Sequence, residues 1–130
     1  MAVICSPGYF TFPDDAVPYP YGLSGMQDRT GREYNKEAFL SLPIFLNVGS
    51  QDVLRTANLL QGEDIDTQQG MNRVERAKRW FGALERQTDE LHITADHRFA
   101  VLDGVGHGFE TTMEKTPLGE LALSFLLEHV

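Results

Sequence analysis

Cysteine is almost absent from this chain, since Cys5 is the only one among 130 residues. One thiol cannot form an internal disulfide, and it supplies too few ligands for a cysteine-rich zinc site. Basic residues are also scarce, with 11 Lys and Arg against 19 Asp and Glu and a formal net charge of -8. This balance argues against binding to a nucleic acid backbone or to an anionic membrane surface.

Long apolar stretches are missing as well. No run approaches the length of a membrane-spanning helix. The opening MAVICSPGYF lacks the charged start and extended apolar region of a signal peptide. The remaining composition, 42% hydrophobic and 23% charged, is ordinary for one globular domain.

Short apolar runs predict buried strands at residues 2–5, 43–48 and 99–102. Each run is continuous rather than alternating, which is typical of strands covered on both faces in a parallel sheet. Between the first two runs, Pro13, Pro18 and Pro20 exclude a regular helix or central strand. We therefore expect residues 11–41 to form an irregular, lid-like segment with at most a helical turn near 35–40.

Two amphipathic segments predict helices. Apolar residues recur at steps of three and four over residues 71–91, and Asn72 is placed as the N-cap. The second segment runs to the end of the chain, with Thr116 expected as N-cap and Pro117 at the first helical position. Strand, helix, strand and helix over residues 42–130 predict an α/β fold: one partial domain, 1–130, with a parallel sheet flanked by helices.

Titratable side chains follow two of the predicted strands. Asp52 lies in NVGSQDV after the strand at 43–48, and His107 lies in VLDGVGHGF after the strand at 99–102. In an open parallel sheet, active groups sit on loops at the carboxyl ends of strands. We expect Asp52 to reach a ring nitrogen of His107, where a carboxylate can orient the imidazole during proton transfer. A surface turn is the alternative interpretation of His107, and Asp103 is a rival for the acid.

The ordered stretches PIFLNVGSQD, QGMNRVERAKRWF and VLDGVGHGF resemble the C-terminal half of an α/β-hydrolase-fold enzyme. In that family the acid follows a late strand in a Gly-x-x-Asp setting, matched by residues 49–52. The histidine follows the last strand in a Gly-x-Gly-His setting, matched by residues 104–107. The resemblance implies that Asp52 orients His107, which acts as general base and then as general acid.

The nucleophile of that family is not found in the sequence. Its serine sits in Gly-x-Ser-x-Gly, on a turn from strand to helix. Ser6 has Ile4 where the first glycine belongs, and Ser24 has Met26 where the second belongs. Cys5 is expected to be a small core residue of its strand. We therefore expect a fragment whose catalytic serine lies upstream, and whose exposed sheet edge promotes self-association when the chain is alone.

Other candidate sites have weaker patterns. Asp64, Asp66, Gln68 and Glu75 have the offsets of a calcium loop, but Gln69 stands where glycine is needed. His92, His97 and Asp96 are expected at the surface rather than on a metal, and His129 beside the negative end of the last helix. Four aromatic residues either line an acyl pocket or pack the loop: Tyr9, Phe12, Tyr19 and Tyr21.

Two functions follow from these patterns. The first is the C-terminal part of a hydrolase of carboxyl esters or related acyl bonds, with His107 and Asp52 as its catalytic residues. The second is a non-catalytic module of the same fold, for binding or structure. Neither function calls for a cofactor or a metal. The expected partner is a small ester or acyl substrate rather than a nucleic acid or a membrane.

Overall fold

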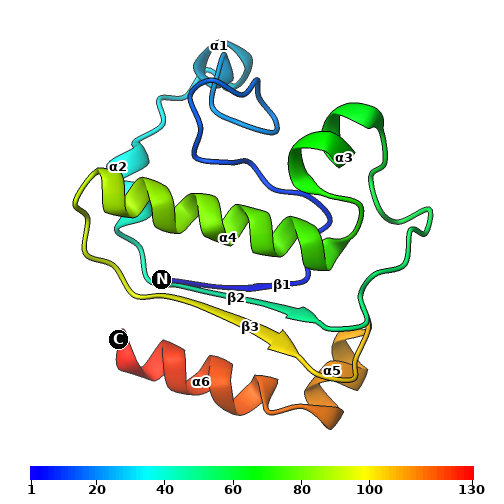
Figure 1. Cartoon of the computed structure of the whole chain (residues 1–130). Helices are drawn as coiled ribbons and strands as arrows, with labels where there is room; N and C mark the ends of the chain where they lie inside the picture. The colour runs from blue at the N-terminus through cyan, green and yellow to red at the C-terminus, as the bar shows by residue number, and fades with distance from the viewer.

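The computed structural model describes all 130 residues as a three-stranded sheet between helices (Figure 1). The strands are β1 (Ala2–Cys5), β2 (Ile44–Gly49) and β3 (His97–Leu102), in the order β1-β2-β3. Both pairings are parallel: Ala2 is opposite Ile44 in one, and Ile44 is opposite His97 in the other. The predicted α/β fold with a parallel sheet is therefore confirmed.

The helices cover the two faces of this sheet. Helix α4 (Arg73–Glu90) lies along one face and α6 (Leu118–Glu128) along the other (Figure 1). The shorter helices are α1 (Met26–Thr30), α2 (Lys36–Leu40), α3 (Glu63–Gln69) and α5 (Phe109–Lys115). As predicted, Asn72 caps α4, because its side chain accepts a hydrogen bond from the Glu75 N–H at 3.0 Å.

The central strand β2 is buried over its whole length because it meets a core on each face. Ile44, Leu46 and Val48 belong to the cluster that contains Trp80 of α4. Phe45 points the other way, into a smaller cluster with Phe125 of α6. This two-sided burial is what the continuous apolar sequence of β2 predicts.

The outer strands are less buried than their apolar sequences predict. β1 pairs with β2 alone, and Cys5 at its end is exposed rather than in the core. β3 is half-buried over most of its length, and Val101 is 41% exposed. The reason is position: an edge strand lacks a neighbour on one side, and the flanking helices cover only part of its surface.

Other boundaries also differ from the prediction. α1 interrupts the segment expected to be irregular, whereas α2 lies where a helical turn was expected. α5 was not predicted. It ends at Lys115 with Thr116 as its C-cap, and α6 has Pro117 rather than Thr116 at its N-cap. The Thr116 hydroxyl still accepts a hydrogen bond from the Leu118 N–H at 3.3 Å.

Candidate active site

The loops after β2 and β3 pack directly on each other. The Gln51 N–H donates to the Val105 carbonyl at 2.9 Å, and the Gly104 N–H donates to the Ser50 hydroxyl at 2.9 Å. Gly49 makes this approach possible, because a Cβ there would lie 2.3 Å from the Val105 carbonyl oxygen. A glycine at the end of β2 therefore permits the contact that brings the two loops together.

Asp52 and His107 meet where these loops touch. The His107 Nδ1 lies 2.9 Å from the Asp52 Oδ2, although 55 positions separate the two residues in the sequence. The Asp52 side chain is 2% exposed, whereas the His107 side chain is 52% exposed. The expected contact is present, with a buried carboxylate behind an accessible imidazole.

This geometry assigns the protons of the neutral imidazole. An ionised carboxylate only accepts hydrogen bonds, so Nδ1 carries the proton and Nε2 is left with a free lone pair. No group of the protein hydrogen-bonds to Nε2. An imidazole in this state can take a proton from a donor at Nε2 while the carboxylate stabilises the resulting imidazolium.

A cavity of about 200 Å³ lies beside His107 and extends to the carboxyl end of β1. Cys5 and Ser6 line it at that end, with Thr112 of α5 and Leu118 of α6 on the helical side. The Ser6 backbone has φ 44°, a conformation uncommon for a residue with a side chain. The Ser6 hydroxyl makes no hydrogen bond within the protein. This cavity is the space in which a reacting group would meet His107.

A second charged side chain touches Asp52, and sequence reasoning missed it. The Arg73 Nη1 lies 3.6 Å from the Asp52 Oδ1, and the Arg73 side chain is 5% exposed. One sequence signal was available. Arg73 is the first residue of α4, where a positive charge opposes the helix dipole, so its presence needs another explanation.

The rival residues lie elsewhere. Asp103 makes no hydrogen bond or ion pair with His107, whose carboxylate partner is Asp52. Ser24 precedes α1, which lies at the opposite side of the molecule from α5 (Figure 1). The Ser24 backbone is occupied in the loop, where its N–H donates to Val17 and its carbonyl accepts from Tyr19. Of the three alternative nucleophiles, Cys5 and Ser6 line the His107 cavity and Ser24 does not.

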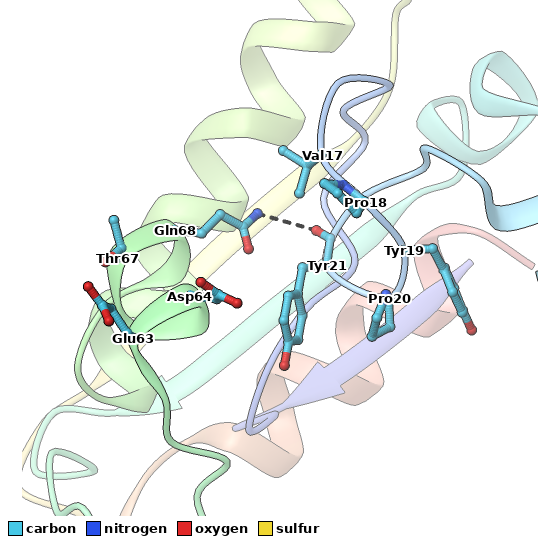
Figure 2. A pocket seen from close by; sticks show the side chains of 9 residues that line it. All are labelled: Val17, Pro18, Tyr19, Pro20, Tyr21, Glu63, Asp64, Thr67 and Gln68. Atoms are coloured by element: carbon cyan, nitrogen blue, oxygen red, sulfur yellow. Dashed lines mark hydrogen bonds between the residues drawn. The ribbon is translucent and has the colours of Figure 1, made fainter.

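Three of the four aromatic residues of the first segment divide between two roles, and the fourth, Tyr9, packs edge-on against Tyr21. Phe12 is buried in the main core, so it packs the fold. Tyr19 and Tyr21 line a hollow of about 660 Å³ between their loop and α3, and Figure 2 shows Tyr21 facing Asp64 across it. The Gln68 side chain spans the same gap to the Tyr21 carbonyl at 3.3 Å (Figure 2). Neither Asp52 nor His107 lines this larger hollow.

The residues with calcium-loop spacing lie in helices instead of a loop: Asp64, Asp66 and Gln68 in α3, and Glu75 in α4. Residues 63–69 are α3, and Asp66 pairs with Arg55 at 2.7 Å and with Arg76 at 2.8 Å. The hydrogen bond from Arg55 and that from Arg76 lower the pKa of Asp66. No group of three or more His, Cys, Asp or Glu side chains is arranged to hold a metal ion.

The remaining histidines lie away from the candidate site. His129 Nδ1 donates to the Phe125 carbonyl at 2.8 Å, and this contact with the end of α6 confirms the prediction. His129 Nε2 lies 3.2 Å from Asp96. His97 begins β3, and His92 lies in the turn after α4 with φ 54°. Only His107 combines a buried carboxylate partner with a free ring nitrogen beside a cavity.

Similarity to known proteins is found among solved structures and not among family models or curated sequences. No protein-family model matches the chain, and no curated sequence matches it. One similar solved structure is the LpqC poly(3-hydroxybutyrate) depolymerase of Bordetella parapertussis, with a TM-score of 0.70 and 25% identity over 86% of this chain. Another is poly(aspartic acid) hydrolase-1 of Sphingomonas sp. KT-1, with a TM-score of 0.74 and 22% identity over 86% of this chain.

These two likenesses cover 36% and 41% of the solved chains, so this chain spans well under half the length of either. Both agree with the α/β fold described above, and both solved proteins are named as hydrolytic enzymes. Within the 130 residues, none of the helices has the length and apolar character needed to cross a membrane.

Proposed function

We propose that this chain is the C-terminal part of an α/β-hydrolase acting on a carboxyl ester or a related acyl bond. The observation that carries the proposal is the 2.9 Å contact between Asp52 Oδ2 and His107 Nδ1 at the carboxyl ends of neighbouring parallel strands. Asp52 follows β2, and His107 follows β3, the last strand in the chain. Acid and histidine therefore come in the order and at the strand ends that the fold family uses.

In the proposed reaction, His107 Nε2 removes a proton from the nucleophile as it attacks the acyl carbon. Asp52 stabilises the imidazolium that forms, and the same Nε2 proton is then given to the leaving group. The cavity beside His107 offers room for the reacting atoms. The likeness to a solved poly(3-hydroxybutyrate) depolymerase, at 25% identity, supports hydrolytic chemistry for this arrangement.

We place the nucleophilic serine on polypeptide upstream of this chain. No serine here stands in Gly-x-Ser-x-Gly. β1 has a free edge on the side away from β2, and its carboxyl end opens on the His107 cavity. A further parallel strand paired to that edge would bring its own carboxyl end, and the nucleophile on it, next to the cavity.

The test is hydrolysis of an activated ester by the 130-residue chain and by a longer polypeptide that carries the upstream strand. We expect turnover only from the longer protein, because a histidine and acid without their nucleophile lose nearly all rate enhancement. Sedimentation of the 130-residue chain adds a check on the free edge of β1, which should promote self-association.

Two serine variants decide where the nucleophile lies. If the 130-residue chain itself turns over ester, Ser6→Ala and Ser24→Ala are compared, since Ser6 lines the cavity and Ser24 does not. Activity lost in one variant alone would identify that serine and contradict the upstream position. A longer protein that binds but does not hydrolyse would favour the second candidate, a non-catalytic module of the same fold.

A further inference from the structure

Arg73 is a buried cation that the proposed reaction does not use directly. Its guanidinium contacts Asp52 Oδ1 through Nη1 at 3.6 Å and donates from Nη2 to the Asn58 carbonyl at 3.1 Å. Its Nε is buried without any hydrogen-bond partner. The side chain is 5% exposed, so the guanidinium is almost completely removed from water.

Local structure gives no reason for an arginine at this position. Arg73 is the first residue of α4, where the helix dipole disfavours a positive charge. The helix is already capped by Asn72, whose side chain accepts from the Glu75 N–H. Burying a charge with one unsatisfied donor is costly unless another charge compensates it. Asp52 is the only carboxylate paired with Arg73, so the compensation comes from the candidate site.

The two Asp52 oxygens have separate partners. Oδ1 faces Arg73, and Oδ2 faces His107 Nδ1. At 3.6 Å the Arg73 contact is longer than a normal hydrogen bond, so its main contribution is the positive charge. Burying a carboxylate as completely as Asp52, which is 2% exposed, is costly unless a charged partner compensates it, and Arg73 provides that charge.

We propose that Arg73 is a positioning residue that holds the buried Asp52 carboxylate by its Oδ1 and leaves its Oδ2 free to hold His107. The catalytic value of this role rests on the proposed function, but the contact itself can be measured without activity. Without the Arg73 charge, the Asp52 Oδ1 loses the partner that holds the carboxylate in this orientation. A displaced Asp52 no longer fixes the Nδ1–H tautomer of His107.

The experiment is NMR of the 130-residue chain with ¹⁵N-labelled histidine, with the His107 ring signals assigned by their loss in His107→Ala. We expect a hydrogen-bonded Nδ1–H signal in the unmodified chain that disappears in Asp52→Asn. The same signal should disappear in Arg73→Met, which keeps an apolar stem but removes the charge. It should return in Arg73→Lys, which restores the charge with a different shape.

Arg86→Met is the matched control. Arg86 lies on the same helix, is exposed, and makes no ion pair or hydrogen bond with a side chain or carbonyl outside α4. The His107 signal should be unchanged in this variant. The signals of the other three histidines report whether each variant is folded. If Arg73→Met is unfolded, a folded Arg73→Lys decides: a retained Nδ1–H signal supports the charge role, and a lost signal overturns it.

The outcomes separate this inference from the proposed function. If Arg73→Met is folded and its His107 Nδ1–H signal is unchanged, the positioning role of Arg73 is overturned. If that signal is nevertheless lost in Asp52→Asn, the proposed Asp52–His107 pair still stands. A His107 signal that does not respond to Asp52→Asn contradicts the pair itself and with it the proposed function.

Discussion

The same three side-chain types meet at both ends of the sheet. At the carboxyl end, Asp52 lies between Arg73 and His107. At the amino end, Asp96 lies between Arg98 and His129, and Arg98 also pairs with Glu128. In both clusters an aspartate beside a strand contacts an arginine and a histidine. The two clusters differ in whether the aspartate or the histidine is the more buried side chain.

The difference lies in which member of each cluster is buried. The Asp52 side chain is 2% exposed and His107 is 52% exposed, whereas Asp96 is 37% exposed and His129 is 17% exposed. Both ring nitrogens of His129 have partners, the Phe125 carbonyl and Asp96. His107 has one free nitrogen beside a cavity. An Asp–His contact is thus a candidate for proton transfer only where the second ring nitrogen has no partner within the protein.

Alanine at the two histidines should give the largest contrast. In the longer polypeptide proposed above, we expect His107→Ala to lower kcat by about 10³-fold or more, because the members of a catalytic triad act as a unit. His129→Ala should leave kcat nearly unchanged, since His129 lies at the far end of the sheet. Steady-state ester hydrolysis measures both variants, and comparable losses in the two would break the distinction between the clusters.

Alanine at the two carboxylates should differ in stability. Asp52→Ala leaves the Arg73 guanidinium buried and unpaired, which we expect to cost about 3–5 kcal/mol in the free energy of unfolding. Asp96→Ala should cost far less, because ion pairs open to solvent contribute little. Urea unfolding of the 130-residue chain compares the two variants. Equal losses would mean that burial does not separate the clusters.

The smallest expected effect is the contribution of the amino-end cluster to the stability of the fold at low pH. A hydrogen bond from Arg98 lowers the pKa of Asp96, so the folded chain takes up this proton at lower pH than the unfolded chain. The ionised carboxylate therefore stabilises the fold above the unfolded value of about 4, and this stability is lost as the pH falls through the lower folded value.

Asp96→Asn should accordingly melt below the unmodified chain at pH about 5 and approach it near pH 2. Arg98 and Ser124 also donate to Glu128 and lower its pKa, but Glu128 is present in both chains and makes both less stable in acid. Thermal melting of both chains across this range measures the difference. A gap in melting temperature that widens on acidification would contradict the assigned sign.

Periodicity and strand order determined much of the architecture and the Asp52–His107 contact. The continuous apolar sequence of β2 predicts that both of its faces are buried. The spacing of apolar residues in α4 predicts its buried side, and Asn72 before them predicts its N-cap. Two residues that each follow a neighbouring parallel strand must end at one edge of the sheet. For this reason a contact over 55 positions was accessible from the sequence.

Only the tertiary structure decided the roles that depend on neighbours from distant segments. The exposure of Cys5 depends on which side of β1 has a partner strand, and its own apolar sequence does not carry that information. The closeness of Arg73 to Asp52 depends on how α4 lies over the sheet, a placement set by packing of the whole core. Local patterns depend on a residue's own neighbours along the chain, whereas charge pairing and exposure depend on whichever segments the fold brings beside it.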